Sequence, residues 1–188
     1  MAEKIKINVK EILICALSLA IIAAGITAAL ALTNAATAGR IEELYQENQS
    51  NLRQQVIDAD SFAEIKFAVD DGEVTCYTAN KGDELVGYVF TVSSTGKSSG
   101  LVVMTGISVE GKVTGVVIVD ENETAGYVDK VKKAGFLGRL TGWDSNTKLK
   151  VGSNIDGVSQ ATKTVKGIAE GVNKALEYYH SLASGEGK

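Results

Sequence analysis

The sequence predicts an α+β fold, with one apolar N-terminal helix followed by a compact domain built on a mainly antiparallel sheet with flanking helices. Three observations carry this prediction. An uncharged run spans Ile12 to Leu32, five segments rich in β-branched residues follow, and two amphipathic segments complete the chain. Because strands joined by short turns pair as hairpins, the sheet is expected to be antiparallel. A chain of 188 residues suits one soluble domain plus a small appendage.

The apolar run predicts a transmembrane helix over residues 12–33, since about 20 apolar residues cross the hydrocarbon core as a helix. Basic residues precede the run and acidic residues follow it: Lys4, Lys6 and Lys10, then Glu42, Glu43 and Glu47. The positive-inside rule therefore places residues 1–11 in the cytoplasm and the domain outside the cell membrane. A cleaved signal peptide ending near Ala38 is the alternative, although the run is longer than the core of a typical signal peptide.

The domain is expected to begin after a connecting helix over residues 34–60 and to span residues 61–182, with a flexible tail over residues 183–188. The predicted strands cover residues 65–69, 74–79, 85–93, 101–109 and 113–119. Glu110-Gly111-Lys112 predicts a tight hairpin turn between the last two. Apolar residues at helical spacing predict helices over residues 127–140 and 162–182.

Several functional classes are disfavoured by composition. The net charge of −4 and the lack of a basic stripe argue against nucleic-acid binding. Cys15 and Cys76 are far apart and form no CxxC motif, so free thiols are expected, and two cysteines are too few for an iron–sulfur cluster. His180 is the only histidine and is expected to be a surface imidazole. We expect no catalytic residues of a hydrolase and no metal site.

The segment 156–164 combines a Gly-containing turn, several hydroxyls and the start of the last predicted helix. Free backbone N–H groups and the positive end of the helix dipole make such a place suited to phosphate, and Lys163 adds a charge. The residues alone leave a second interpretation open, in which Ser159 or Thr162 simply caps the helix.

The run Ser159-Gln160-Ala161-Thr162-Lys163-Thr164 resembles the S-G-A-T-x-[S/T] flavinylation motif. That motif occurs in the G and D subunits of Rnf complexes and in the B and C subunits of the sodium-pumping NADH:quinone reductase. The resemblance implies FMN joined through its phosphate to Thr164 by a flavin transferase, with Ser159, Ala161, Thr162 and Lys163 beside it. Gln160 departs from the motif, which has glycine at that position.

A second stretch, Glu123-Thr124-Ala125-Gly126-Tyr127-Val128-Asp129-Lys130, resembles the E-T-P-G-L-G-x-K loop of the same FMN-binding domain. The resemblance implies that Glu123, Thr124 and Gly126 lie against the flavin. Tyr127 is expected to pack on the flavin ring, because aromatic faces suit flat π-systems. Phe136 and Trp143 are candidates either to cover the flavin or, as we favour, to pack in the core.

The whole chain then resembles the G subunit of an Rnf complex, which couples electron transfer between ferredoxin and NAD to Na+ or H+ translocation. The resemblance implies an electron-transfer subunit of a translocase, a covalent FMN cofactor, and as partners the membrane lipid and other Rnf subunits, including the flavinylated D subunit. Alternatives are a C-type subunit of the sodium-pumping NADH:quinone reductase, a stand-alone membrane-anchored flavoprotein of an extracellular electron-transfer chain, and a domain that has lost its flavin.

Overall fold

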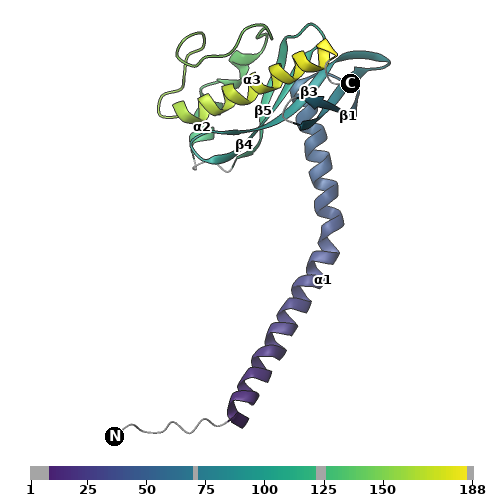
Figure 1. The fold of residues 1–188 in the computed structure, drawn as a ribbon, viewed down its shortest axis with the longest axis vertical. Helices are drawn as coiled ribbons and strands as arrows, with labels where there is room; N and C mark the ends of the chain where they lie inside the picture. Colours follow the sequence, from purple (N-terminus) through teal and green to yellow (C-terminus); the bar gives the residue numbers. More distant parts are fainter. Residues whose placement is uncertain (1–8, 70–71, 122–125, 186–188) are drawn as a thin grey trace. The chain divides into compact units, whose positions relative to one another are not determined.

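The computed structural model describes residues 9–69, 72–121 and 126–185 (Figure 1). The chain divides into two compact units, one up to Glu47 and one from Asn48 onward. Most of the predicted N-terminal segment 1–11 lies outside the described residues, and so does the second half of the predicted tail.

The first element is α1 (Val9–Val56), a single helix of 48 residues. The predicted membrane helix and the predicted connecting helix are thus parts of one helix, which ends at Val56 rather than at residue 60. It is the one described helix that is long and apolar enough to cross a membrane. The hydroxyls of Ser18, Thr33 and Thr37 are bonded within the helix, as the Ser18 hydroxyl is to the carbonyl of Cys15 at 2.9 Å. Such bonding lowers the cost of placing hydroxyls in an apolar environment.

The second unit is built on five strands in the order β1-β2-β3-β4-β5, with every neighbouring pair antiparallel, which confirms the predicted sheet. The strands are β1 (Ser61–Val69), β2 (Gly72–Lys81), β3 (Glu84–Thr95), β4 (Ser99–Ser108) and β5 (Val113–Glu121). Most of them extend beyond their predicted bounds, because polar residues at strand ends continue the ladder without changing the apolar alternation. The predicted β4–β5 turn is confirmed, with Gly111 at φ +78° and the Ser108 N–H donating to the Lys112 carbonyl at 2.8 Å.

Alternation along the strands gives the sheet two apolar faces. On one face, α3 (Thr162–Ser184) lies across the strands (Figure 1). Its buried side chains share one core cluster with Phe90 and Val103. On the other face, Val56 at the end of α1 packs on Val89 and Met104. The burial of these side chains from water is the main source of the domain's stability.

Close approach of the α1 end to the sheet requires glycine. A Cβ atom at Gly106 or Gly115 would come within 2.5 or 2.9 Å of the backbone of Val56. The Thr114 hydroxyl donates to the carbonyl of Val56 at 2.5 Å. The last turn of α1 is therefore a fixed part of the domain rather than a linker beside it.

The predicted helix over residues 127–140 is wrong in its second half. The structure has α2 (Tyr127–Lys133), a break at Gly135 with φ +63°, and then the 3-10 turn η1 (Leu137–Leu140). A left-handed residue cannot continue an α-helix, and glycine adopts this conformation readily. Phe136 follows the break, and its side chain is fully buried in the core, as favoured from the sequence.

Trp143 also packs against the core and is partly buried. Its indole N–H donates to the carbonyl of Thr147 at 2.6 Å. Buried indoles usually find such a partner. Core packing is therefore the observed role of both aromatic residues that were candidates to cover a flavin.

Candidate functional site

The motif residues gather at the N-terminal end of α3, beside a pocket of about 240 Å³. Three separate parts of the chain form this pocket: the β3–β4 turn, the start of α2 and the turn before α3. The lining residues are Lys97, Tyr127, Gln160, Ala161, Thr162 and Lys163. The fold thus brings Tyr127 of the second sequence stretch next to the flavinylation-like motif, although about 35 residues separate the two stretches in the chain.

The start of α3 has no side-chain cap among the described residues. Ala161 occupies the N-cap position and no side chain bonds there, so the interpretation of Ser159 or Thr162 as a cap is wrong. The first helical bond runs from the Val165 N–H to the Ala161 carbonyl at 2.9 Å. Backbone donors of residues 162–164 therefore lack helical acceptors, which is the arrangement that binds phosphate at helix N-termini.

Thr164 is fully buried, and its hydroxyl oxygen has no hydrogen-bond partner among the described residues. Its neighbour Thr162, by contrast, is exposed and lines the pocket. An unpartnered buried hydroxyl costs about 1–3 kcal/mol. Valine would fill the same volume without this cost, so the Thr164 oxygen is the strongest local sign of a chemical role.

Gln160 stands where the resembling motif has glycine, and the structure shows why glycine suits that position. Gln160 has φ +62°, and it is the one described non-glycine residue with positive φ. A side chain in this left-handed region costs roughly 1 kcal/mol. The substitution therefore preserves the turn that glycine would form, and Gln160 adds a bond from Lys130, whose ammonium donates to the amide oxygen at 2.8 Å.

Tyr127 lies between two lysines. The ammonium of Lys97 donates to its hydroxyl at 2.6 Å and lies 4.0 Å from the ring centroid, and the ammonium of Lys130 lies 5.4 Å from that centroid. The hydrogen bond and positive charge of Lys97 lower the pKa of the Tyr127 phenol. Lys97 was not predicted from the sequence, because a lysine in a hairpin turn carries no motif. The ring of Tyr127 therefore has cations as its observed neighbours, and its predicted packing on a flavin ring stays a prediction.

The pocket fits the phosphate end of FMN. Its described lining includes two lysines and no carboxylate, next to the uncapped helix start. Its volume is below the roughly 300–1,000 Å³ of most ligand pockets, so the rest of the cofactor must extend past these lining residues. Glu123 and Thr124, predicted contacts, lie outside the described residues, whereas Gly126 is exposed at φ +83° just before α2.

A larger cleft of about 700 Å³ lies between β2, β3 and the middle of α3. Its described lining contains none of the predicted site residues. We favour the smaller pocket as the cofactor site, because it combines the helix start, the motif and the lysines.

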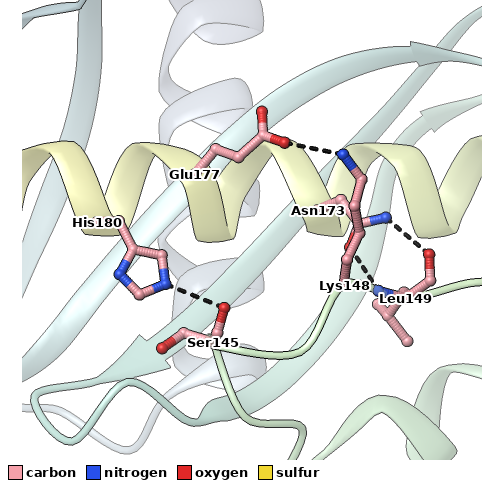
Figure 2. Close-up of polar contacts among 6 residues, drawn as sticks. All are labelled: Ser145, Lys148, Leu149, Asn173, Glu177 and His180. Carbon is pink, nitrogen blue, oxygen red and sulfur yellow. Dashed lines mark hydrogen bonds and ion pairs between the residues drawn. The ribbon is translucent and has the colours of Figure 1, made fainter.

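Further along α3, the chain is tied to the segment before the motif (Figure 2). The Asn173 amide accepts from the Leu149 N–H at 2.8 Å and donates to the Leu149 carbonyl at 3.0 Å. Lys148 pairs with Glu177 at 3.2 Å, and the exposed His180 imidazole bonds the Ser145 carbonyl at 3.0 Å. His180 is thus a surface residue as predicted, and Asn173 is a structural residue that was not predicted from the sequence.

The buried thiol of Cys76 is poorly suited to redox chemistry. Both cysteines are free, as predicted. Burial raises the pKa of the Cys76 thiol to about 12, so the reactive thiolate is scarce. Within the described ranges, no group of three or more His, Cys, Asp or Glu side chains could hold a metal ion.

Comparison with known proteins agrees with this geometry. Residues 96–177 match the family model of the FMN-binding domain, and residues 1–56 match that of the RnfG N-terminal region. The first match covers the β3–β4 turn, the pocket and most of α3.

Three related proteins align over most of their length, and each is the G subunit of a larger complex. The protein from the Na(+)-translocating ferredoxin:NAD(+) oxidoreductase complex of Acetobacterium woodii is 32% identical, over 96% of this chain and 98% of that protein. The protein from the ion-translocating oxidoreductase complex of Stutzerimonas stutzeri is 30% identical, over 87% and 78%. The protein from the proton-translocating ferredoxin:NAD(+) oxidoreductase complex of Clostridium ljungdahlii is 30% identical, over 75% and 76%. The chain belongs to the family of G subunits of the Rnf ion-translocating ferredoxin:NAD oxidoreductase complexes.

Proposed function

We propose that this chain carries one FMN, joined by a phosphoester to the Thr164 hydroxyl, as an electron-transfer subunit of an Rnf complex. The single observation that carries the proposal is the Thr164 oxygen, which is buried and unpartnered among the described residues at the uncapped start of α3. Membership of the G-subunit family supports an electron-transfer role in an ion-translocating ferredoxin:NAD oxidoreductase.

Attachment requires an activated flavin, because forming a phosphoester from an alcohol and a free phosphate is unfavourable in water. A flavin dinucleotide supplies the activation in its phosphoanhydride bond. The Thr164 oxygen forms the new O–P bond, the P–O bond of the anhydride breaks, and the nucleoside monophosphate leaves. The hydroxyl proton passes to a base on the flavin transferase, and no electron is transferred in this step.

The residues around Thr164 would then hold the phosphate. Backbone N–H groups of residues 162–164 would donate to it, and the lysines of the pocket would offset its negative charge. Bound FMN supplies one- and two-electron chemistry that the side chains lack. The role of this chain is to keep that group at a fixed site between electron donors and acceptors in other subunits.

The membrane arrangement is part of the proposal. The apolar part of α1 anchors the chain in the lipid bilayer, with the N-terminus in the cytoplasm and the flavin domain outside, because basic residues precede the run and acidic residues follow it. The partners are other Rnf subunits, including the flavinylated D subunit, and a flavin transferase acting outside the membrane. Protease added to intact cells, with any outer membrane permeabilised, should digest the domain. Full protection of the domain would contradict this orientation.

The first experiment is in-gel flavin fluorescence of the denatured full-length chain after coexpression with a flavin transferase. Wild type and Thr164→Ser should fluoresce, since both supply an alcohol, and Thr164→Val should be dark. Mass spectrometry of the peptide containing residues 159–166 should place the FMN on Thr164.

Thr162 is the main alternative attachment site, because its side chain is exposed on the same turn. If Thr162→Val were dark and Thr164→Val fluorescent, the attachment site would be Thr162 rather than Thr164. A dark wild-type band would contradict the covalent cofactor altogether and favour a domain that has lost its flavin.

A further inference from the structure

The Thr164 hydroxyl is inaccessible in the closed domain. The residue is 0% exposed and does not line the pocket beside it. A transferase must bring the phosphorus of its donor into contact with this oxygen, so a fully buried acceptor cannot react. If Thr164 carries the flavin as proposed above, part of the domain must therefore open to expose this hydroxyl.

Residues 157–164, here called the entry segment, are anchored by the buried Ala161 and by Val158, but three local features oppose the closed conformation. Gln160 has left-handed backbone, the helix start lacks a side-chain cap, and the Thr164 oxygen is unpartnered among the described residues. Each feature raises the free energy of the closed conformation, and all three fall within five residues. Segments of low local stability open while the rest of the domain stays folded.

A side-chain bond ties the entry segment to a firmly packed element. Lys130 donates to the Gln160 amide at 2.8 Å, and Lys130 is carried by α2, whose Val128 and Val131 are buried. Both ends of this bond are exposed, so the bond can break without disturbing the core. Its loss would make opening of the entry segment more frequent while α2 stays in place.

We infer that the entry segment is a gate over the modification site, and that the Lys130–Gln160 bond sets how often it opens. FMN attachment occurs through the open conformation, in which the Thr164 oxygen is free to form its bond to phosphorus. The motif glycine is replaced here by a residue that keeps the turn and adds a fastening to α2.

The test uses the full-length apo-chain with excess flavin transferase and flavin dinucleotide. Under these conditions the attachment rate follows the open fraction. Gln160→Leu and Lys130→Met remove the same bond from opposite sides, and only the second removes a charge. Both should raise the rate about two- to fivefold, as expected for one exposed hydrogen bond, and the double variant should be no faster than either single variant. Lys133→Met, which removes a charge from the same helix without touching this bond, is the matched control and should leave the rate unchanged.

Hydrogen exchange provides a measurement that needs no flavin. The amides of Ala161 and Val165, which are hydrogen-bonded to the carbonyls of Val158 and Ala161 in the closed conformation, should exchange faster in Gln160→Leu and Lys130→Met by the same factor as the attachment rate. Amides in the middle of α3 should be unaffected, because the domain itself remains folded. Equal exchange in all variants would overturn the gate.

The sign of the rate change separates the gate from its main competitor. If Lys130 instead bound the anionic donor, Lys130→Met would slow attachment and Gln160→Leu would not speed it, and the inference would be wrong. Equal rates in all variants, with FMN on Thr164, would overturn the gate and leave the proposed function standing. A chain that never takes up flavin would overturn both.

Discussion

The two halves of α3 differ in how completely their polar groups are bonded. In the second half, the Asn173 amide makes two hydrogen bonds to Leu149, and the Tyr179 hydroxyl donates to the Val109 carbonyl at 2.8 Å. At the start of the same helix, no described side chain forms a cap and the Thr164 oxygen is unpartnered. The second half of α3 thus has its polar groups hydrogen-bonded, whereas the start of the helix does not.

This difference teaches where to look for function in a small domain. Buried polar groups are normally bonded, and local violations gather where the protein must bind or react. The bonded half fixes the position of α3 on the sheet and holds the segment before the motif. The unsatisfied end is then available to a ligand, because the rest of the helix does not depend on it.

The largest stability effect is expected in the bonded half. Asn173→Ala removes both bonds and leaves the Leu149 N–H and carbonyl without partners, which should lower the free energy of unfolding by about 2–4 kcal/mol. Urea unfolding followed by the fluorescence of Trp143, the single tryptophan, reports on this domain. Asn146→Ala, an exposed asparagine in the same region, should change it by no more than about 0.5 kcal/mol. Equal effects of the two variants would remove the contrast between the halves.

At the unsatisfied end, the same kind of substitution should have the opposite sign. Thr164→Val keeps the side-chain shape and removes the unpartnered hydroxyl, so the apo-domain should become more stable by about 1 kcal/mol. The variant should at the same time be unable to carry covalent FMN. Urea unfolding of apo-protein, purified without a flavin transferase, measures the first effect.

Thr164→Ser serves as the control for Thr164→Val, because it keeps the hydroxyl and loses a methyl group. It should be less stable than wild type by about 1 kcal/mol. A destabilised Thr164→Val would mean that the hydroxyl is bonded in solution, and the Thr164 oxygen would then no longer support a chemical role.

The sequence predicted the parts of this molecule that depend on local pattern. The apolar run, the strand alternation and the order of turns predicted the apolar N-terminal helix, the antiparallel sheet and α3, because each depends on neighbouring residues. The break at Gly135 was missed as a helix end, since a glycine within an apolar helical pattern is often tolerated. The resemblance of residues 159–164 to a known motif places the cofactor site at the start of α3, and this location stays a prediction.

What the sequence could not predict depends on contacts between distant segments. Lys97 reaches Tyr127 only because the β3–β4 turn folds against the start of α2. The hydrogen bonds between Asn173 and Leu149 join residues 24 positions apart, and no sequence periodicity indicates them. The burial of Thr164 follows from tertiary packing, whereas a polar residue in the first turn of a helix is normally expected at the surface.

A smaller effect should separate backbone strain from side-chain bonding at the unsatisfied end. Gln160→Gly removes the strain and the bond to Lys130, whereas Gln160→Ala removes the bond alone. Gln160→Gly should therefore be more stable than Gln160→Ala by about 0.5–1 kcal/mol, despite the greater freedom of glycine in the unfolded chain. The measurement is again urea unfolding of the apo-protein. Equal stabilities would show that residue 160 leaves the left-handed region in solution. Backbone strain would then not contribute to the free energy of the closed conformation at the start of α3.

The smallest effect concerns charge beside the pocket. The hydrogen bond and charge of Lys97 lower the pKa of the Tyr127 phenol from its usual 10.0. A lowered folded-state pKa favours the ionised form, so the Lys97 contact adds stability above about pH 10 and loses that contribution as the pH falls through the lowered pKa. The difference in phenolate absorbance between wild type and Tyr127→Phe isolates this one group among six tyrosines.

Lys97→Met should move the Tyr127 titration back toward 10.0. Tyr88 in β3 is an internal control, because burial raises the pKa of its phenol and shifts its ionisation to higher pH. The two tyrosines should therefore titrate on opposite sides of the usual value in one protein. If Tyr127 ionised no earlier than Tyr88, Lys97 would not be held at the phenol in solution. The positive charge assigned to this end of α3 would then rest on Lys163 and the helix start alone.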